Sequence, residues 1–427
     1  MTNESVVIGA GLAGLTAALR LTEHGHHVVI VARGAGATHL APATVDVLGY
    51  VGDDRVDSPA ASFEQLFARS PHHPYRRVTL AQIEAALTWF SERVAGLGYT
   101  GGVAENLLLS TAIGVPRPSA LIPRTMRGGD LRAGGRFVFV GLRGFKDFHP
   151  SLLADNLGNA RVPIPLTARA VELALPRDRL GDLGGRRLAE RFDSSQYRDW
   201  LVDSLRGKLE PDERVGLPAV LGLRRAEDAW QELENRLERQ VFEVPTLPPS
   251  IPGMRLFDAL TARLRAAGVR VIFGVTAVGA TTRDGRIDAV AVANASGTAS
   301  YRAQSVVLAS GGFASGGLAL DSRGVTRETV FDLPVAGVPA AGPVRFAPRY
   351  FDEQPLAGSG VAVDEQLRPV DADGKPVYGN LHAAGAILGG AVPWKEKSGS
   401  GISLATGYAA AEAIRGVAVT SMAEPVR

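Results

Sequence analysis

A glycine-rich turn between two short apolar segments constrains the fold of this chain more than any other feature of its sequence. Residues 6–8 (Val-Val-Ile) are apolar, the turn Gly9-Ala10-Gly11-Leu12-Ala13-Gly14 follows at once, and a second apolar segment covers residues 28–31. Between them, apolar residues recur at helical spacing until a glycine at position 25. This order predicts a strand, a helix and a second, parallel strand, which together form a βαβ unit.

Each glycine of the turn has a separate physical role in a unit of this kind. The first permits the tight turn, the second lets the backbone approach a phosphate, and the third lets the helix pack closely against the strand. The first amides of the helix then face an anion at the positive end of the helix dipole. We therefore expect the segment to bind a nucleotide through Gly9, Gly11, Leu12, Ala13 and Gly14.

The end of the second strand lacks the acidic side chain that commonly holds an adenosine ribose. The residues there are Ala32, Arg33 and Gly34, which we take as further contacts of the ligand. In one interpretation the ligand has no adenosine, as in a mononucleotide. In a second, backbone atoms or water hold the ribose, and in a third, Arg33 holds a phosphate as in NADP sites.

The C-terminal part of the chain repeats the order of strand, glycine-rich turn and helix. Residues 380–385 (Asn-Leu-His-Ala-Ala-Gly) predict a strand that runs into glycine, and a helix is expected from about residue 403. We expect this turn to face the same crevice as the N-terminal one. Its candidate contacts are Gly385, Gly389, Gly390, Gly401 and Ile402.

Composition excludes several classes of function. The chain has no cysteine, so it holds no disulfide, no thiolate-bound zinc or iron–sulfur cluster and no cysteine nucleophile. Its formal net charge of +2 is too balanced for a nucleic-acid-binding surface. No stretch reaches the ~20 apolar residues that span a bilayer, and no targeting segment is visible. We expect no metal site, no nucleic-acid partner, no membrane span and a cytoplasmic location.

Seven segments together resemble one family of flavoproteins. They are VVIGAGLAGLTAALRLTEHGH, VARGAGATHLAPATVDVL, HPY at 73–75, GLRGFKDF, PTLPPSIPGMRL, VVLASGGFASGGL and NLHAAGAILGG. The chain looks like a flavoprotein of the glutathione-reductase or succinate-dehydrogenase type, and the whole set is similar to the B subunits of anaerobic glycerol-3-phosphate dehydrogenases. PTLPPSIPGMRL and ASGGFASGGL are the most specific segments, because the general flavin fold does not require them.

The resemblance implies an FMN flavoprotein that works with a catalytic A subunit and a membrane-associated iron–sulfur C subunit. Such a complex oxidises sn-glycerol 3-phosphate, a small phosphorylated substrate, to dihydroxyacetone phosphate and passes electrons to a quinone pool. The chain would then reach the cell membrane only peripherally, through a partner. The missing acid at Ala32 agrees with FMN, which has no adenosine, and FAD is the alternative.

The expected architecture is an α/β, Rossmann-like FAD/NAD(P)-binding domain with a long insertion. The flavin-binding domain comprises residues 1–45, 251–320 and 376–427. Residues 46–250 form an inserted α+β domain, and residues 321–375 form a connecting region with a hairpin. The segment 243–253 holds four prolines and is expected to be an irregular strap.

The chemistry of a flavin suggests which side chains to look for. A flavin accepts a hydride at N5, and the protein positions it; we expect the loop with Thr38 and His39 to contact it. Oxidising an alcohol also needs a base for the hydroxyl proton. His39 is the first candidate, followed by His73, His149 and His382. A substrate phosphate favours arginine, and the arginines near predicted loops are Arg33, Arg124, Arg143, Arg345 and Arg349.

Three hypotheses remain open at this point. In the first, the chain is the FMN subunit of a glycerol-3-phosphate:quinone oxidoreductase, which oxidises the substrate or relays electrons from a partner. In the second, it is a self-sufficient FAD oxidoreductase that acts on another small substrate. In the third, it is a flavin-fold scaffold without turnover. The identity of the bound flavin separates the first two, and colourless protein would favour the third.

Overall fold

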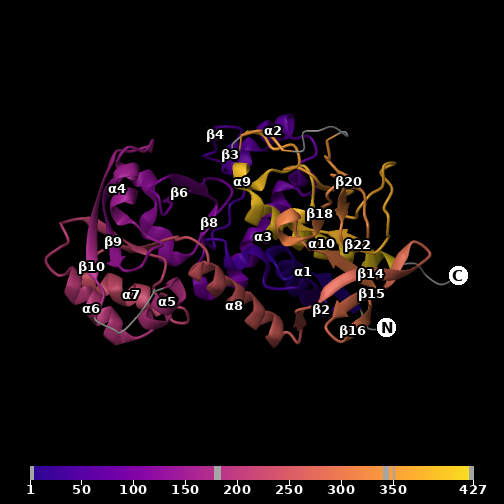
Figure 1. Ribbon diagram of the computed structural model, residues 1–427, viewed down its shortest axis with the longest axis horizontal. Helices are drawn as coiled ribbons and strands as arrows, with labels where there is room; N and C mark the ends of the chain where they lie inside the picture. The colour runs from indigo at the N-terminus through magenta and orange to yellow at the C-terminus, as the bar shows by residue number, and fades with distance from the viewer. Residues whose placement is uncertain (1–3, 177–183, 340–345, 350–351, 423–427) are drawn as a thin grey trace.

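The computed structural model describes residues 4–176, 184–339, 346–349 and 352–422, with residues 416–422 described by their backbone alone. Two hydrophobic cores lie toward the two ends of the molecule's long axis (Figure 1). The larger core contains strands from both parts of the chain nearest the termini, and the smaller core is built from its middle. Helix α8 (Ile251–Ala266) lies between them, with Leu256 in the larger core and Ile251 in the smaller one.

The larger core contains a five-stranded, wholly parallel sheet in the order β13-β2-β1-β17-β22. The strands are β1 (Glu4–Ile8), β2 (His27–Ala32), β13 (Arg270–Phe273), β17 (Ser305–Leu308) and β22 (Leu381–Ala383). The central strands β1 and β17 are almost entirely buried and rich in valine, which is typical of parallel strands covered on both faces. The parallel sheet confirms the expected α/β class.

Helices α1 (Leu12–Glu23), α3 (Leu80–Arg93) and α10 (Gly399–Met422) pack together in this core. Glycine permits the close approach of α1 and α10, because a Cβ on Gly407 would lie 2.5 Å from the carbonyl oxygen of Ala13. Arg20 on α1 also donates to Glu412 on α10 at 2.6 Å. The N-terminal and C-terminal patterns therefore lie side by side.

The smaller core contains a four-stranded parallel sheet in the order β10-β9-β11-β12. Its strands are β9 (Gly135–Arg143), β10 (Leu166–Ala174), β11 (Glu213–Pro218) and β12 (Val241–Val244). The helices between them are α4 (Pro150–Gly158), α5 (Gly185–Phe192), α6 (Ser195–Leu205) and α7 (Ala226–Leu237). Strands and helices alternate here and all strand pairs of the sheet are parallel, so this core is of the α/β class and not of the α+β class that we expected for the insertion.

Short elements complete the described chain. A three-stranded antiparallel sheet is formed by β14 (Thr276–Arg283), β15 (Arg286–Asn294) and β16 (Gly297–Arg302). The two-stranded pairs are β3 (Tyr50–Val51) with β4 (Asp54–Arg55), β5 (Thr100–Gly101) with β8 (Leu121–Ile122), β6 (Leu107–Ser110) with β7 (Pro116–Ser119), β18 (Leu318–Leu320) with β19 (Thr326–Glu328), and β20 (Val335–Ala336) with β21 (Gly360–Val361). The remaining helices are α2 (Pro59–Arg69), α9 (Pro393–Glu396) and the 3₁₀ helices η1 (Gly36–His39), η2 (Pro74–Arg77), η3 (Ala95–Leu97), η4 (Arg124–Gly129), η5 (Leu131–Ala133), η6 (Phe313–Ser315) and η7 (Gly385–Ile387).

The two cores divide the chain at a different place from the one we expected. Residues 47–103 were assigned to the insertion, but Val47, Phe63, Ile83 and Phe90 are buried in the larger core. The reason is that α3 packs against α10. The smaller core draws on residues 108–251. Parts of the expected domains, residues 1–3, 177–183, 340–345, 350–351 and 423–427, lie outside the described residues.

The irregular part of the proline-rich segment 243–253 is shorter than expected. β12 extends to Val244, and α8 already begins at Ile251, so only the residues between them are irregular. Pro252 fits the first turn of α8 because a helix needs no N–H there, and the Ser250 side chain accepts from the Gly253 N–H at 3.1 Å. Among the helices in the described ranges, none has both the length and the apolar character needed to cross a membrane.

Candidate functional site

The glycine turn lies at the edge where the parallel strands of the larger sheet end. β1 is followed by Gly9, β2 by Arg33, β17 by Ala309 and β22 by Ala384. Since the strands are parallel, their carboxyl ends share this edge, which is where α/β sheets bind their ligands. β1 is the middle strand, so the glycine turn has loop residues on both sides.

The surroundings of the three glycines differ. Gly9 has a φ of +110°, and a Cβ there would lie 2.2 Å from the carbonyl oxygen of Ala309. A Cβ on Gly14 would lie 2.0 Å from the carbonyl oxygen of Gly9, so α1 approaches β1 only without a side chain here. A Cβ on Gly11 would meet no atom of the described chain within 4 Å. The protein itself requires Gly9 and Gly14, whereas the space beside Gly11 is open to a ligand.

Helix α1 directs its first amides toward this space. Gly11 is the N-cap, and no side chain among the described residues caps the helix. The Leu15 N–H donates to the Gly11 carbonyl oxygen at 3.0 Å. The amides of Leu12, Ala13 and Gly14 precede this bond, so they have no acceptor one turn earlier within the helix. Amides at the positive end of a helix dipole favour an anion such as a phosphate.

The short helix η1 borders the same space from the side of β2. A Cβ on Gly36 would lie 2.9 Å from the Cα of Gly11, so η1 touches the glycine turn. The Thr38 hydroxyl and the Nε2 atom of His39 are buried and have no partner in the described part of the chain. Thr38 is only 6% exposed, and the His39 ring contacts Phe257 edge-on with 4.6 Å between the ring centroids.

Ser310 carries another buried hydroxyl without a partner in the described ranges, and we did not predict it as a site residue. It follows β17, and a Cβ on Gly9 would lie 3.4 Å from its amide nitrogen. A signal was present, because a serine between a buried strand and the pair Gly311-Gly312 stands at the ligand-binding edge of the sheet. An unpaired buried polar group costs about 1–3 kcal/mol, so Thr38, His39 and Ser310 fit a ligand that provides polar partners.

These groups together fit a flavin nucleotide. The amides of α1 would hold a phosphate, and the open side of Gly11 would let it approach. Thr38 and His39 on one side, and Ser310 on the other, would bond to polar atoms of the rest of the cofactor. The chain offers these groups from loops that follow three neighbouring strands, β2, β1 and β17.

The end of β2 offers no acidic group to an adenosine ribose. Ala32 is 5% exposed, and its carbonyl oxygen accepts from the Val275 N–H at 3.3 Å. Arg33 is exposed, and its guanidinium lies 2.8 Å from the position that a Cβ on Gly316 would occupy. Gly34 is exposed and borders open space. Arg33 is therefore placed between β2 and the loop after β17, at the same edge of the sheet as the glycine turn.

Three glycines of the C-terminal turn pack against protein instead of presenting free amides. The amides of Gly385, Gly389 and Gly390 donate to protein oxygens at 2.8–3.2 Å. A Cβ on Gly385 would lie 2.8 Å from the Cβ of Ala13, and one on Gly390 would lie 2.1 Å from the carbonyl oxygen of His72. The amides of these three glycines are therefore not free to donate to a ligand in this conformation.

The amides of the two candidate contacts at the start of α10 also donate to acceptors within the protein. The amide of Gly401 donates to the carbonyl oxygen of Asp46 at 2.9 Å, and that of Ile402 to the carbonyl oxygen of Ser398 at 2.8 Å. A Cβ on Gly401 would lie 2.4 Å from the Tyr75 hydroxyl. Gly401 is therefore the point where the chain at residue 46 crosses the helix, and its amide is closed to a ligand in this conformation.

Of the four histidines considered as bases, His39 is the one in η1, the short helix whose Gly36 touches the glycine turn. His73 is fully buried; its Nδ1 accepts from the Tyr75 N–H at 3.1 Å, so its Nε2 donates to Glu396 at 3.1 Å. His382 lies within β22, where burial lowers its pKa to about 4. His149 is exposed and is the N-cap of α4, a helix that packs in the smaller core.

Most of the candidate arginines lie away from this site. Arg124 pairs with Glu227 between η4 and α7. Arg143 and Arg349 are exposed. Arg345 lies outside the described residues. Among the described candidates, Arg33 is the one whose guanidinium lies beside Gly316 at this edge.

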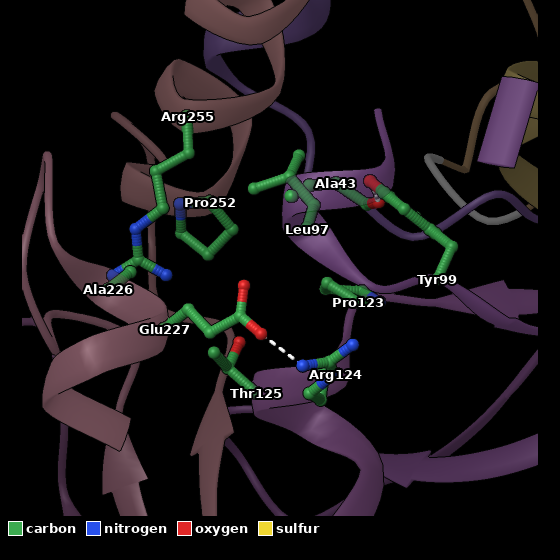
Figure 2. A pocket seen from close by; sticks show the side chains of 11 residues that line it. Ala43, Leu97, Tyr99, Pro123, Arg124, Thr125, Ala226, Glu227, Pro252 and Arg255 are labelled. Carbon is green, nitrogen blue, oxygen red and sulfur yellow. Dashed lines mark hydrogen bonds and ion pairs between the residues drawn. The ribbon is translucent and has the colours of Figure 1, made fainter. Parts of the chain in front are cut away.

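Two cavities lie away from the glycine turn. One lies between the two cores and is lined in part by Ala43, Tyr99, Arg124 and Glu227 (Figure 2). Figure 2 shows Arg124 and Glu227 joined across it, with Pro252 and Arg255 on its α8 side. The other is a groove beside α2, η2 and α3. Neither is lined by a residue of the glycine turn.

Comparison with known proteins gives the following matches. Residues 4–402 match the FAD binding domain family. The B subunit of the probable anaerobic glycerol-3-phosphate dehydrogenase of Halobacterium salinarum is 34% identical, and the match covers 96% of this chain and 97% of that protein. The B subunit of the anaerobic glycerol-3-phosphate dehydrogenase of Yersinia pseudotuberculosis is 34% identical, and the match covers 97% of this chain and 98% of that protein. Among solved structures, 3-ketosteroid delta1-dehydrogenase from Sterolibacterium denitrificans aligns with 97% of this chain and 100% of its own, with a TM-score of 0.47 and 12% identity.

Proposed function

The chain belongs to the family of anaerobic glycerol-3-phosphate dehydrogenase B subunits and to the FAD binding domain family, and from this premise we propose that it is the flavoprotein B subunit of such an enzyme. The enzyme would oxidise sn-glycerol 3-phosphate to dihydroxyacetone phosphate. The observation that carries the proposal is 34% identity over 96% of this chain and 97% of its relative. A match of that extent covers both cores.

The glycine turn and its neighbours support a flavin as the cofactor. When bound, a flavin supplies hydride acceptance at N5. The amides of Leu12, Ala13 and Gly14 would hold its phosphate, and Thr38 and Ser310 would donate to its polar atoms. The protein in turn would exclude water from the carboxyl edge of the sheet, where these groups are already largely buried.

We propose His39 as the group that receives the substrate's hydroxyl proton, if this chain itself oxidises the substrate. Its Nε2 is buried without a partner in the described chain, and its loop touches the glycine turn through Gly36. His73 is less suitable because both of its ring nitrogens are bonded. If a partner protein oxidises the substrate, the same imidazole would position the cofactor only.

We propose FMN rather than FAD as the cofactor. The support is the end of β2, where Ala32 is buried and no acidic side chain is available for an adenosine ribose. FAD is the alternative that the description of the matching family favours. Ala32→Glu should favour FAD by about tenfold relative to FMN, since a hydrogen bond to a charged group contributes about 1.5–3 kcal/mol. Titration of the apoprotein with each flavin measures the ratio, and an unchanged ratio would show that this position does not discriminate.

The proposed enzyme is a complex, and this chain would depend on partner subunits to carry electrons from its flavin to the final acceptor. A catalytic A-type subunit and an iron–sulfur, membrane-associated C-type subunit are the partners we propose, with a quinone pool as the final acceptor. The absence of cysteine supports this division, because the chain cannot hold iron–sulfur clusters of its own. Contact with the cytoplasmic face of the membrane would be made by a partner.

The test is to identify the flavin and then the activity. Purified protein is denatured and the released flavin is identified by mass; the proposal expects FMN. The intact chain is then combined with its candidate partners, and reduction of a quinone analogue by sn-glycerol 3-phosphate is measured. Stoichiometric FAD with activity in the absence of partners would favour a self-sufficient oxidoreductase. Protein that remains colourless after incubation with either flavin would favour a scaffold.

A further inference from the structure

The first turns of α8 hold the loop that carries Thr38 and His39. The Ser250 N–H, directly before the helix, donates to the His39 carbonyl oxygen at 2.8 Å. A Cβ on Gly253 would lie 2.1 Å from the carbonyl oxygen of Thr38, so helix and loop are in direct backbone contact. One turn further along, Phe257 contacts the His39 ring. These three positions follow helical spacing and face the same loop.

The same part of α8 is fastened to the smaller core by a buried ion pair. Nη1 and Nη2 of Arg255 donate to the two carboxylate oxygens of Glu243 at 2.6 and 2.9 Å, and Nε donates to the Gly222 carbonyl oxygen at 2.8 Å. Glu243 also accepts from the Leu221 N–H at 2.9 Å. Arg255 is 7% exposed and Glu243 is 2% exposed. A guanidinium bonded through all three nitrogens permits little rotation of the helix that carries it.

A buried ion pair is often no more stabilising than apolar side chains of the same size, and in some proteins it fixes the orientation of the elements that it joins. Arg255 is two residues from Gly253 and therefore on nearly the opposite side of α8. Any rotation of the helix would press Gly253 against the Thr38 carbonyl or withdraw it. The cavity in Figure 2 adjoins this joint, with Pro252 and Arg255 on one side and Ala43 on another.

We propose that Arg255 and Glu243 are positioning residues which, through α8, set the place of Thr38 and His39 beside the cofactor. The inference rests on the proposed function, since it needs a flavin at the glycine turn. It assigns a role to the smaller core, which contributes none of the cofactor contacts named above. The smaller core would thus hold the loop with Thr38 and His39 in position without itself touching the cofactor.

The test compares variants at the two ends of this connection. Glu243→Gln removes the charge of the pair, Arg255→Lys keeps the charge without the fork, and Gly253→Ala disturbs the contact with Thr38 while leaving the pair intact. Glu190→Gln is the control, because Glu190 pairs with Arg186 at 3.1 Å on the exposed side of α5. Flavin affinity, the visible absorption spectrum of bound flavin and the thermal unfolding midpoint are measured for each.

We expect Glu243→Gln and Gly253→Ala to weaken flavin binding by about tenfold, which is the order of affinity lost with one hydrogen bond to a buried polar group. Both should alter the visible spectrum, Arg255→Lys should be intermediate, and Glu190→Gln should match the parent. Glu243→Gln should have much less effect on affinity when Thr38 is already replaced by valine, because coupled residues are not additive.

The outcomes separate the two proposals. A parent protein that binds no flavin contradicts the proposed function. A parent that binds flavin, with variants that lose thermal stability but keep its affinity and spectrum, overturns the positioning role. If Glu243→Gln does not fold, Gly253→Ala decides, because parental affinity and spectrum in that variant contradict the inference equally.

Discussion

At Gly11 a Cβ would meet no atom of the described chain within 4 Å, so no contact within the described chain requires a glycine there, and we propose that a ligand does. Gly11→Val should therefore fold normally. It should lose flavin affinity by about 100-fold, since a branched side chain would block the hydrogen bonds from the α1 amides to a charged phosphate, each of which contributes about 1.5–3 kcal/mol. Flavin titration measures the affinity, and circular dichroism with thermal unfolding tests the fold.

Gly184 offers a matched control for this substitution. It is the N-cap of α5, has the same φ of −75° as Gly11, and also has no atom of the described chain within 4 Å of a built Cβ. Gly184→Val should bind flavin like the parent protein. If Gly11→Val kept parental affinity, the flavin would have to lie elsewhere.

The burial of His382 should make the stability of the larger core depend on pH. The side chain is 2% exposed, its Nδ1 donates to the Gln366 carbonyl oxygen at 2.8 Å, and burial lowers its pKa to about 4. An unfolded histidine has a pKa of about 6.5. Between these two values the unfolded chain binds more protons, so stability falls as the pH decreases through this window, by up to about 3 kcal/mol.

His382→Asn should reduce this pH dependence while keeping a donor for Gln366. The measurement is urea unfolding at about pH 7 and about pH 5, within the window set by the two pKa values. The parent should lose more unfolding free energy between the two conditions than the variant. Equal losses would show that His382 takes up its proton in the folded state as readily as in the unfolded one.

At the scale of elements, local signals predicted β1, α1 and β2, but they did not predict how the C-terminal turn is used. The strand–glycine–helix order between residues 6 and 31 is visible within a few residues, because turn, cap and apolar spacing are local. Whether the amide of Gly401 is free depends on residue 46, which lies far away in the sequence. The same holds for Gly385, whose acceptor is Thr406.

The backbone of residues 46 and 47 lies so close to Gly401 that even a methyl side chain there would collide with it. A Cβ would lie 2.6 Å from the Cα of Val47 and 2.7 Å from the carbonyl oxygen of Asp46, and backbone atoms cannot turn aside. Gly401→Ala should lower the free energy of unfolding by about 1–3 kcal/mol, as overpacking does. Urea unfolding measures it. Gly158→Ala, with no atom of the described chain within 4 Å, is the control, and a loss of equal size there would contradict the steric cause.

At the scale of the whole molecule, the sequence predicted an insertion but not where it begins. Periodicity shows that α3 has an apolar face, yet not that this face packs against α10 more than 300 residues later. Residues 47–103 therefore belong to the larger core. The proposed cofactor site therefore lies in the larger core, and α8 with its buried ion pair to Glu243 is one of the connections to the smaller core.

This arrangement predicts that flavin binding to the larger core also stabilises the smaller core. FMN at 100 times its Kd stabilises the state that binds it by about 2.7 kcal/mol. Trp200 and Trp230 pack against the smaller core. The chain has four tryptophans, so replacing Trp89 and Trp394 with phenylalanine leaves tryptophan fluorescence that reports on the smaller core alone. In this background, FMN should raise the thermal midpoint of the smaller core, because Arg255 and Glu243 fasten it to α8.

Breaking the pair should confine the effect of FMN to the larger core. With Glu243→Gln in the same background, the fluorescence midpoint should no longer respond to FMN, while calorimetry of the same sample should still show a stabilised transition for the larger core. If the fluorescence midpoint followed FMN equally with and without the pair, the two cores would be coupled through other contacts. If calorimetry showed no response to FMN in either protein, the larger core would not be the one that binds the cofactor.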